Sequence, residues 1–394
     1  MVSQICFRPS MMLVGEELQP VKDQSLIVTD GRIEAIGEPD WNCRQVELKG
    51  ALLVPMFIDA HTHVGDTGAK ELCTGLPLEQ AVIPPHGLKH RFLASLDTVT
   101  HIRMMRHGLL EMLSNGIIAC ADFREQGLTG VRNLRRAAED LPIRVRILGR
   151  MDEKLQGEAL YAEASELLEE ADGLGVRDAC CYDASILARL TRAYRHKIFA
   201  AHVSEDRHSE TVCFQQSRQS QTQRALEWGS QILVHLVHAS DEDLQLAARS
   251  SGVFGVSCPR SNSLLGDGLP RLSVWERVGL PFGLGSDNVM LSSPDMLREM
   301  DYASRMTRGM TEEPTAISSL TLLKAATIAG ARALQLDQEL GSLSPGKEAS
   351  FIAFDLNSLN LTYIHDPISA LVHRASTADI IGIYIRGELW KQSF

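Results

Sequence analysis

Runs of apolar residues alternate with segments of helical periodicity through the middle of the chain. Seven of eight runs are separated from the next by a stretch that could hold a helix, such as "LTGVRNLRRAAEDL". Buried apolar strands that alternate with helices are typical of parallel βα units. The runs are "ALLVPMFIDA", "GIIACADF", "IRVRILGR", "LGVRDACC", "KIFAAHVS", "QILVHLVHA", "GVFGVSCP" and "LPFGLGSD". They predict an α/β fold, a (β/α)8 TIM-like barrel over residues 55–344. An open doubly wound sheet is the alternative, but no glycine-rich phosphate loop follows the first run.

Both ends of the chain are rich in β-forming residues. The stretch "SLIVTDGRIEAIGEP" has two such runs around Asp30-Gly31, and "IIGIYIRGELW" turns at Arg386-Gly387. Such dipeptides between β-rich runs predict hairpins. We therefore expect residues 1–54 and 345–394 to form one small β-sandwich domain.

The amino-acid composition limits the kinds of binding partner and the cellular compartment that the protein can be expected to have. The 394 residues include 39 basic and 50 acidic side chains, a net charge of −11, which argues against nucleic acid or an anionic membrane as partner. No apolar run approaches the length of a membrane span, and no signal peptide is recognisable. The eight cysteines are scattered without a C-x-x-C pair, and the adjacent Cys180 and Cys181 suit a disulfide poorly. This pattern predicts a reducing, cytoplasmic location.

Histidine and acidic residues gather at the ends of the predicted strands, where this fold places its active site. The first run ends in His61 and His63, which share one face of a strand because they are two residues apart. His202 ends the fifth run, and Asp287 ends the eighth. Imidazoles and a carboxylate that converge are typical of a site for a divalent transition metal with one position left for water.

The spacing of residues along the chain also predicts which histidine of the sixth run faces the site and how Glu205 reaches it. His235 and His238 are three residues apart in the sixth run, so only one can face the site if the strand is regular. We predict that His238, nearer the end of the strand, faces the site and that His235 packs among helices. Glu205, three residues after His202, should reach the site from the loop after the fifth run.

Arginines also lie near strand ends. The simplest interpretation of these arginines is that they form salt bridges at the barrel rim. Together they could instead bind an anionic or carbonyl-rich substrate. The candidates for substrate binding are Arg124, Arg177 and Arg260.

The motifs "PMFIDAHTH", "HVSE", "HLVHAS", "CPRSN", "GLGSDN" and "GSLSPGKEASFIAFD" resemble, in order and spacing, those of the amidohydrolase superfamily. The resemblance is to the branch of cytosine, guanine and S-adenosylhomocysteine deaminases and chlorohydrolases, and it covers nearly the whole chain. It implies four metal ligands, His61, His63, His202 and Asp287. It implies Glu205 and His238 as catalytic groups. As a ligand of the metal, Asp287 could also accept the proton of the bound water, which makes it a third catalytic candidate. No lysine ends the fourth run, which favours one divalent metal per chain, with zinc preferred and iron the alternative.

These features predict a hydrolase of carbon–nitrogen bonds other than peptide bonds. The first hypothesis is deamination of a purine, pyrimidine, pterin or nucleoside, a small-molecule substrate, with release of ammonia. The second is hydrolysis of a cyclic amide, as in imidazolonepropionase. The third is a non-catalytic oligomeric scaffold, but such a protein would be expected to lose these residues. The segment 64–100 differs from the usual substrate loop of the branch and leaves the substrate open. The oligomeric state is open too, a homo-oligomer included.

Overall fold

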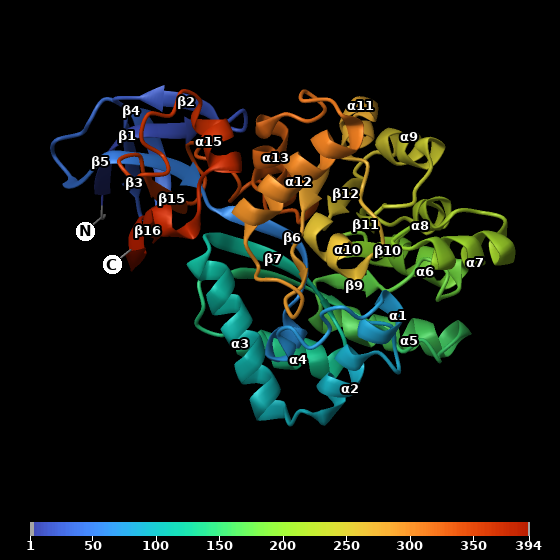
Figure 1. Cartoon of the computed structure of the whole chain (residues 1–394). Helices are drawn as coiled ribbons and strands as arrows, with labels where there is room; N and C mark the ends of the chain where they lie inside the picture. Colours follow the sequence, from blue (N-terminus) through green and yellow to red (C-terminus); the bar gives the residue numbers. More distant parts are fainter. Residues whose placement is uncertain (1–3, 393–394) are drawn as a thin grey trace.

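The computed structural model describes residues 4–392 and contains the predicted barrel (Figure 1). Each of the eight apolar runs holds a strand, and neighbouring strands pair in parallel. The strands are β6 (Phe57–His63), β7 (Ile117–Arg124), β8 (Arg144–Gly149), β9 (Gly173–Val176), β10 (Ile198–Val203), β11 (Ile232–His235), β12 (Phe254–Ser257) and β13 (Phe282–Leu284). Most of their side chains are buried, as parallel strands covered on both faces require.

The barrel closes through a short ninth strand segment, β14 (Asp287–Asn288), which follows β13 in the chain and pairs with β6. In this pairing Asp287 lies opposite Thr62. Close approach depends on a glycine, because a Cβ added at Gly285 would lie 2.7 Å from the carbonyl oxygen of His61. The end of the eighth run therefore lies beside the first run, and Asp287 comes close to His61 and His63.

Helices cover the outside of the barrel (Figure 1). Several begin where a side chain caps the first turn. Asp97 caps α3 (Thr98–Ser114), Ser220 caps α8 (Gln221–Trp228) and Ser240 caps α9 (Asp241–Arg249). The helices after the strands are α4 (Gly127–Ala137), α5 (Gly157–Glu170), α6 (Ala184–Ala193), α7 (Arg207–Ser217), α8 (Gln221–Trp228), α9 (Asp241–Arg249), α10 (Pro259–Leu265), α11 (Leu272–Val278), α12 (Met296–Thr311), α13 (Ser319–Ala325) and α14 (Ile328–Ala333). Between β6 and β7 lie the 3-10 helix η1 (Val64–Ala69), α1 (Leu78–Ala81), α2 (Leu88–Ser95) and α3 (Thr98–Ser114).

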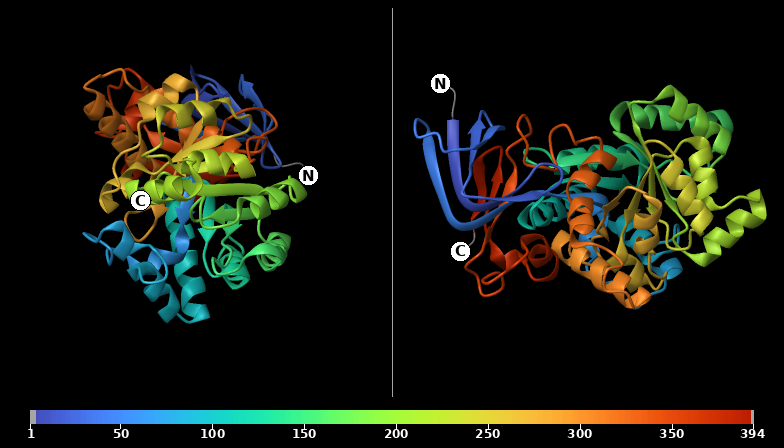
Figure 2. Two further views of the ribbon diagram at one scale, coloured as in Figure 1. Left: turned by 90° about the vertical axis from the view of Figure 1, so that its right-hand side faces the viewer. Right: turned by 90° about the horizontal axis from the view of Figure 1, so that it is seen from above.

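The two ends of the chain form one mixed sheet beside the barrel (Figure 2). Its strands are β1 (Gln4–Val14), β2 (Gln19–Lys22), β3 (Ser25–Thr29), β4 (Arg32–Gly37), β5 (Arg44–Pro55), β15 (Phe351–Asp355), β16 (Ile380–Ile385) and β17 (Glu388–Gln392), with α15 (Pro367–His373) and η2 (Thr377–Asp379) between β15 and β16. Both predicted hairpins are confirmed, one joining β3 to β4 and the other β16 to β17. The left-handed φ angles of 50° at Asp30 and 78° at Gly31 explain the choice of that dipeptide.

The terminal sheet and the barrel share hydrophobic packing. Met56, which is buried, is the one residue between β5 and β6. Ile352 of β15 belongs to the same hydrophobic cluster as the barrel interior. The predicted domain boundaries at 54/55 and 344/345 stay predictions, and residues 1–3 and 393–394 of the predicted terminal domain lie outside the described residues. Within residues 4–392, no helix has the length and apolar character needed to cross a membrane.

Candidate metal centre and active site

Side-chain nitrogen and oxygen atoms from β6, β10, β11 and β14 meet at the carboxyl end of the barrel strands. Nε2 of His61 lies 3.2 Å from Nε2 of His202 and 3.3 Å from Oδ1 of Asp287. The same Asp287 oxygen is 3.5 Å from Nε2 of His63. The ring of His235 lies 5.1 Å from that of His202, measured between centroids. All five side chains are buried. The structure therefore brings together the four predicted metal ligands, with His235 as a fifth member of the cluster.

The alternation of side chains along β6 explains how two histidines enter one site. His61 and His63 face the cluster, whereas Thr62 points away and donates a 3.0 Å hydrogen bond to the carbonyl oxygen of Asp287. That bond ties β6 to β14 on the side opposite the histidines. The spacing of His61 and His63 in the sequence is thus sufficient to predict their shared orientation.

The Nδ1 atoms of His63 and His202, which point away from the cluster, lie close to backbone carbonyl oxygens of the barrel. Nδ1 of His63 lies 3.1 Å from the carbonyl oxygen of Phe123 and 3.1 Å from Oε1 of Glu125. Nδ1 of His202 donates to the carbonyl oxygen of Arg177 at 3.1 Å. A histidine that donates from Nδ1 presents the lone pair of Nε2, and such partners are typical of histidines that bind a metal.

The other members of the cluster are also oriented. Ser261 donates a 2.5 Å hydrogen bond to Oδ2 of Asp287, which leaves Oδ1 turned toward the histidines. Nδ1 of His235 lies 3.1 Å from the side-chain amide nitrogen of Asn262. Both partners belong to α10, so the helix after β12 supports two side chains of the cluster.

The protonation states of the cluster suit a metal. Burial lowers the pKa of His61 and of His202, and burial together with the charge of Lys89 lowers the pKa of His63 to about 3. Burial alone would raise the pKa of Asp287, but its contact with His61 holds that pKa well below the ordinary value. Neutral imidazoles and an ionised carboxylate are the forms that bind metals. Three imidazole nitrogens and one carboxylate oxygen fit a divalent transition metal.

The assignment of His238 to the site is corrected by the structure. β11 ends at His235, whose left-handed φ of 78° is followed by one of 49° at Leu236, and the chain leaves the strand there. His235 points into the cluster. His238 lies beyond the strand, and its Nε2 donates to the carbonyl oxygen of Asp267 at 2.6 Å. The prediction extended the strand three residues too far, so it placed the wrong histidine in the site.

A pocket of about 60 Å³ opens onto the cluster, and Glu205 lies on its wall. Glu205 follows β10, as the spacing predicts, and its Oε1 is 3.6 Å from Nε2 of His235. Burial, followed by the charge of Asp287, raises the pKa of Glu205 well above the ordinary value. A carboxyl group with a raised pKa keeps its proton to higher pH and can donate it to a bound molecule.

The segment between β6 and β7 contributes a residue that the sequence analysis missed. Lys89, at the start of α2, lines the pocket although its side chain is only 3% exposed. Its Nζ is 2.6 Å from Oε1 of Glu125 and 3.7 Å from Oδ2 of Asp66. No periodicity marks this lysine, so only the folded chain reveals it.

Two of the three arginines predicted to bind substrate lie outside the pocket lining. Arg124 is completely buried, where it contacts Glu125 and where its Nη1 is 3.4 Å from Oδ1 of Asp122. It lies beneath η1, and an added Cβ at Gly65 would meet its guanidinium. Arg260 is held by Glu299, with 3.1 Å between Nη1 and Oε1. Both arginines are drawn to buried carboxylates and away from the barrel mouth.

Arg177 differs from these two because it does line the pocket. Its Nε is 2.6 Å from Oε1 of Glu153, and its carbonyl oxygen orients His202. A role in substrate binding stays a prediction for this residue.

We expect Arg124→Met to lower the free energy of unfolding by about 3–5 kcal/mol, because it leaves Asp122 and Glu125 as buried charges without this partner. Chemical denaturation measures the change. Arg132→Met is the control, because its pair with Glu170 is exposed and should matter little. Equal stability of Arg124→Met and the parent protein would contradict a structural role for Arg124.

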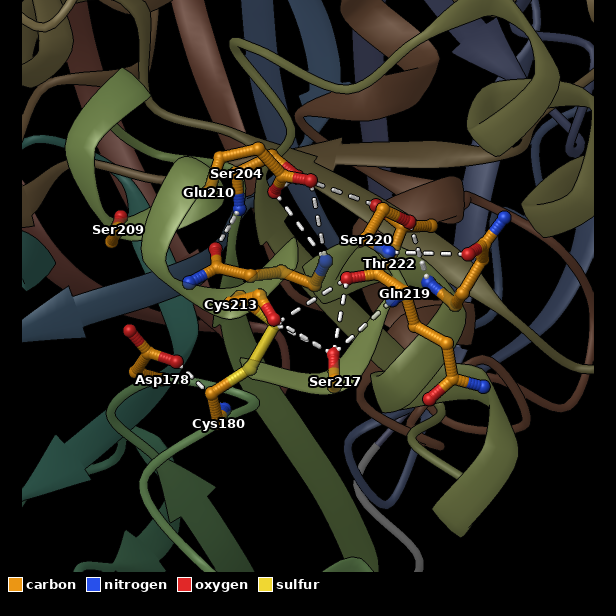
Figure 3. The surroundings of a disulfide bond; sticks show 12 residues. Asp178, Cys180, Ser204, Ser209, Glu210, Cys213, Ser217, Gln219, Ser220 and Thr222 are labelled. Carbon is orange, nitrogen blue, oxygen red and sulfur yellow. Dashed lines mark hydrogen bonds between the residues drawn. A yellow bond between two sulfur atoms is a disulfide. The ribbon is translucent and has the colours of Figure 1, made fainter. Parts of the chain in front are cut away.

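The expectation of free thiols is also corrected. Figure 3 shows Cys180, which follows β9, bonded to Cys213 of α7. The bond joins the loop of Asp178 to the helix of Ser209, and both of these residues line the pocket. The partners are 33 residues apart, a pairing that spacing alone does not reveal. The cysteines therefore no longer support the predicted cytoplasmic location.

Comparison with known proteins identifies the family. The chain belongs to the amidohydrolase family, whose model matches residues 52–390. It is a hydrolase that acts on carbon–nitrogen bonds. A putative aminohydrolase of Methanothermobacter thermautotrophicus is 34% identical over 393 residues, which cover 97% of each chain. A 5-methylthioadenosine/S-adenosylhomocysteine deaminase of Thermodesulfovibrio yellowstonii is 25% identical over 411 residues, covering 96% of this chain and 91% of the relative.

Solved structures share the fold over nearly the whole chain. An adenosine deaminase from Xanthomonas campestris with bound zinc has a TM-score of 0.83 and 20% identity, covering 98% of this chain and 92% of that one. Guanine deaminase from E. coli has a TM-score of 0.81 and 20% identity, covering 99% of each chain. These likenesses establish a TIM barrel with a second sheet from the termini.

Proposed function

We propose that this protein is a metal-dependent aminohydrolase. It removes the amino group of an amino-substituted nitrogen heterocycle and releases ammonia. One divalent metal per chain, zinc in preference to iron, is held by His61, His63, His202 and Asp287. The observation that carries this proposal is one small pocket lined both by members of the donor cluster and by Glu205, whose pKa is raised by burial.

The bound metal would act as a Lewis acid and would lower the pKa of a water molecule toward neutrality. Asp287, kept ionised by its histidine neighbours, would accept a proton from the attacking water. Glu205 would donate its proton to the ring nitrogen beside the attacked carbon, and would later pass a proton to the departing amine. His235, 3.6 Å from Glu205, would hold that carboxyl and the incoming oxygen in position. Water adds, ammonia leaves, and the ring keeps one oxygen in place of the amino group.

The relatives agree with this chemistry. The full-length matches include a protein called a putative aminohydrolase and a deaminase of 5-methylthioadenosine and S-adenosylhomocysteine. Among solved structures of the same fold, an adenosine deaminase and an atrazine chlorohydrolase hold zinc. These names support deamination at a nitrogen heterocycle and a zinc site.

The reaction can be tested by screening purines, pyrimidines, pterins and their nucleosides for ammonia release with zinc-loaded protein. Mass spectrometry of the product should show NH2 replaced by OH, a gain of one mass unit. A product heavier by one water, with no ammonia from any aminated ring, would instead indicate a cyclic amide hydrolase.

We expect His235→Ala to reduce turnover by roughly 10²-fold or more, since it removes a group beside both Glu205 and the donor cluster. His238→Ala is the matched control, three residues along the chain. It should retain turnover because the His238 side chain hydrogen-bonds to the Asp267 carbonyl and is not part of the pocket lining. Steady-state kinetics on the best heterocycle compares the two. A larger loss in His238→Ala would return the site to the arrangement expected from the sequence.

A further inference from the structure

We propose that Lys89 is a specificity-determining residue, whose ammonium group binds an exocyclic oxygen on the substrate ring. This inference rests on the proposed function only in taking a heterocycle as the ligand. It assigns a binding role to the segment between β6 and β7, which contributes neither a predicted metal ligand nor the proposed acid.

Lys89 is fixed in place by the packing of its own segment. Its neighbours Leu88 and Phe92 on α2 join a hydrophobic cluster that includes Leu265, at the end of α10, and Met290, which follows β14. Helix α2 is therefore anchored to the barrel, and Lys89 is directed inward. A lysine side chain is normally exposed, so a side chain only 3% exposed on a pocket wall is unusual.

The ammonium has hydrogen-bonding capacity to spare. It carries three N–H donors and no acceptor. Among residues 4–392, its ion pairs and hydrogen bonds reach only Glu125 at 2.6 Å and Asp66 at 3.7 Å, and the second distance is too long for a hydrogen bond. The Asp66 oxygens already accept hydrogen bonds from Asn288 and from the backbone nitrogen of Met290. Donors of Lys89 therefore remain for a molecule in the pocket.

Neutralising Glu125 does not require Lys89. Glu125 contacts the guanidinium of Arg124, and its Oε1 is also 3.7 Å from Nη1 of Arg150. Arg150 lines the same pocket. Lys89 is thus a third cationic neighbour of Glu125, on a wall that also holds the carboxyl of Asp66. An oxygen with negative charge or a carbonyl dipole is the complement that such a wall favours.

Because the ammonium of Lys89 can only donate hydrogen bonds, the pocket should discriminate between substrates by the group that they present to it. A ring carbonyl or an anionic oxygen can accept from Lys89, whereas a second amino group at that position cannot. Buried polar groups left without a partner are costly, so a ring that lacks the oxygen should bind more weakly. The ring selected is one that carries an oxygen on the Lys89 side and the reactive substituent on the Asp287 side.

The test measures binding and does not depend on turnover. Isothermal titration of zinc-loaded protein uses two pairs of probes, xanthine with purine and uracil with pyrimidine, which differ in their exocyclic oxygens. Lys89→Met keeps length and removes the charge. We expect it to weaken binding of the better oxo-ring by roughly 10- to 100-fold and to change binding of its counterpart by less than about threefold. Lys70→Met is the matched control from the same segment, since Lys70 pairs with Glu111 at the surface.

Equal losses for both members of a pair would overturn the inference, as would failure of the unsubstituted protein to bind either oxo-ring. If Lys89→Met is unfolded at the assay temperature, Lys89→Gln is compared by the same affinity ratio. Because none of these four probes carries an amino group, ammonia release is recorded in parallel with the best aminated heterocycle of the screen. Lys89-dependent binding without ammonia release would refute deamination and leave Lys89 assigned. Ammonia release that is unchanged in Lys89→Met would refute the assignment of Lys89 alone.

Discussion

Asp287→Ala should remove the bound metal and reduce turnover to background. Among residues 4–392, Oδ1 of Asp287 is the one carboxylate oxygen paired with both histidines of β6, so the variant leaves His61 and His63 without that anionic partner. Elemental analysis of protein purified without chelator should give close to one metal per chain in the parent and far less in the variant. His61→Ala should behave in the same way.

Asp267→Ala is the matched control for this experiment. Asp267 is also a buried carboxyl near Glu205, but it lies outside the donor cluster. It should keep the metal. Two equivalents of metal in the parent protein would contradict a mononuclear site, and full metal content in Asp287→Ala would remove Asp287 from the set of ligands.

Glu205→Gln is expected to separate catalysis from metal binding. The amide keeps the shape of the carboxyl but cannot give up or regain a proton at neutral pH. Turnover should therefore fall by roughly 10²- to 10⁴-fold, the range for a positioned general acid or base. Metal content should not change. Steady-state kinetics and elemental analysis of the same preparations provide both readouts.

The control for Glu205→Gln is Glu210→Gln. Glu210, on α7, accepts a hydrogen bond from Ser204 and is not part of the pocket lining, so its amide should remain active. Loss of metal from Glu205→Gln would indicate that Glu205 is a ligand. Undiminished turnover would exclude it as the proton donor.

The sequence predicted best where strand geometry alone decides the outcome. His61 and His63 face the same cluster, as the rule that alternate residues on a strand share a face predicts. Asp287 is predicted at the site because it ends the eighth run, and the structure places it opposite Thr62 of β6. Both inferences need only the order of strands and a period of two.

The sequence predicts least well the residue at which a strand ends and the position of a side chain that is set by ion pairs in the folded protein. The run "QILVHLVHA" is apolar beyond His235, so nothing in it marks the left-handed turn that excludes His238. Arg124 looks like a rim residue, yet Asp122 and Glu125 draw it into the interior. Lys89 and the Cys180–Cys213 pair depend on segments that meet only after folding.

The placement of β5 between β1 and β15 imposes an order on biosynthesis. β5 ends at Pro55 and β15 begins at Phe351. During synthesis, the edge of β5 that pairs with β15 therefore has no partner strand until nearly three hundred further residues have been added. At the usual pace of translation that delay is roughly 15 to 60 seconds. An unpaired edge invites pairing with other nascent chains. Messages truncated before codon 351 should therefore yield aggregating products even when every barrel strand has been made.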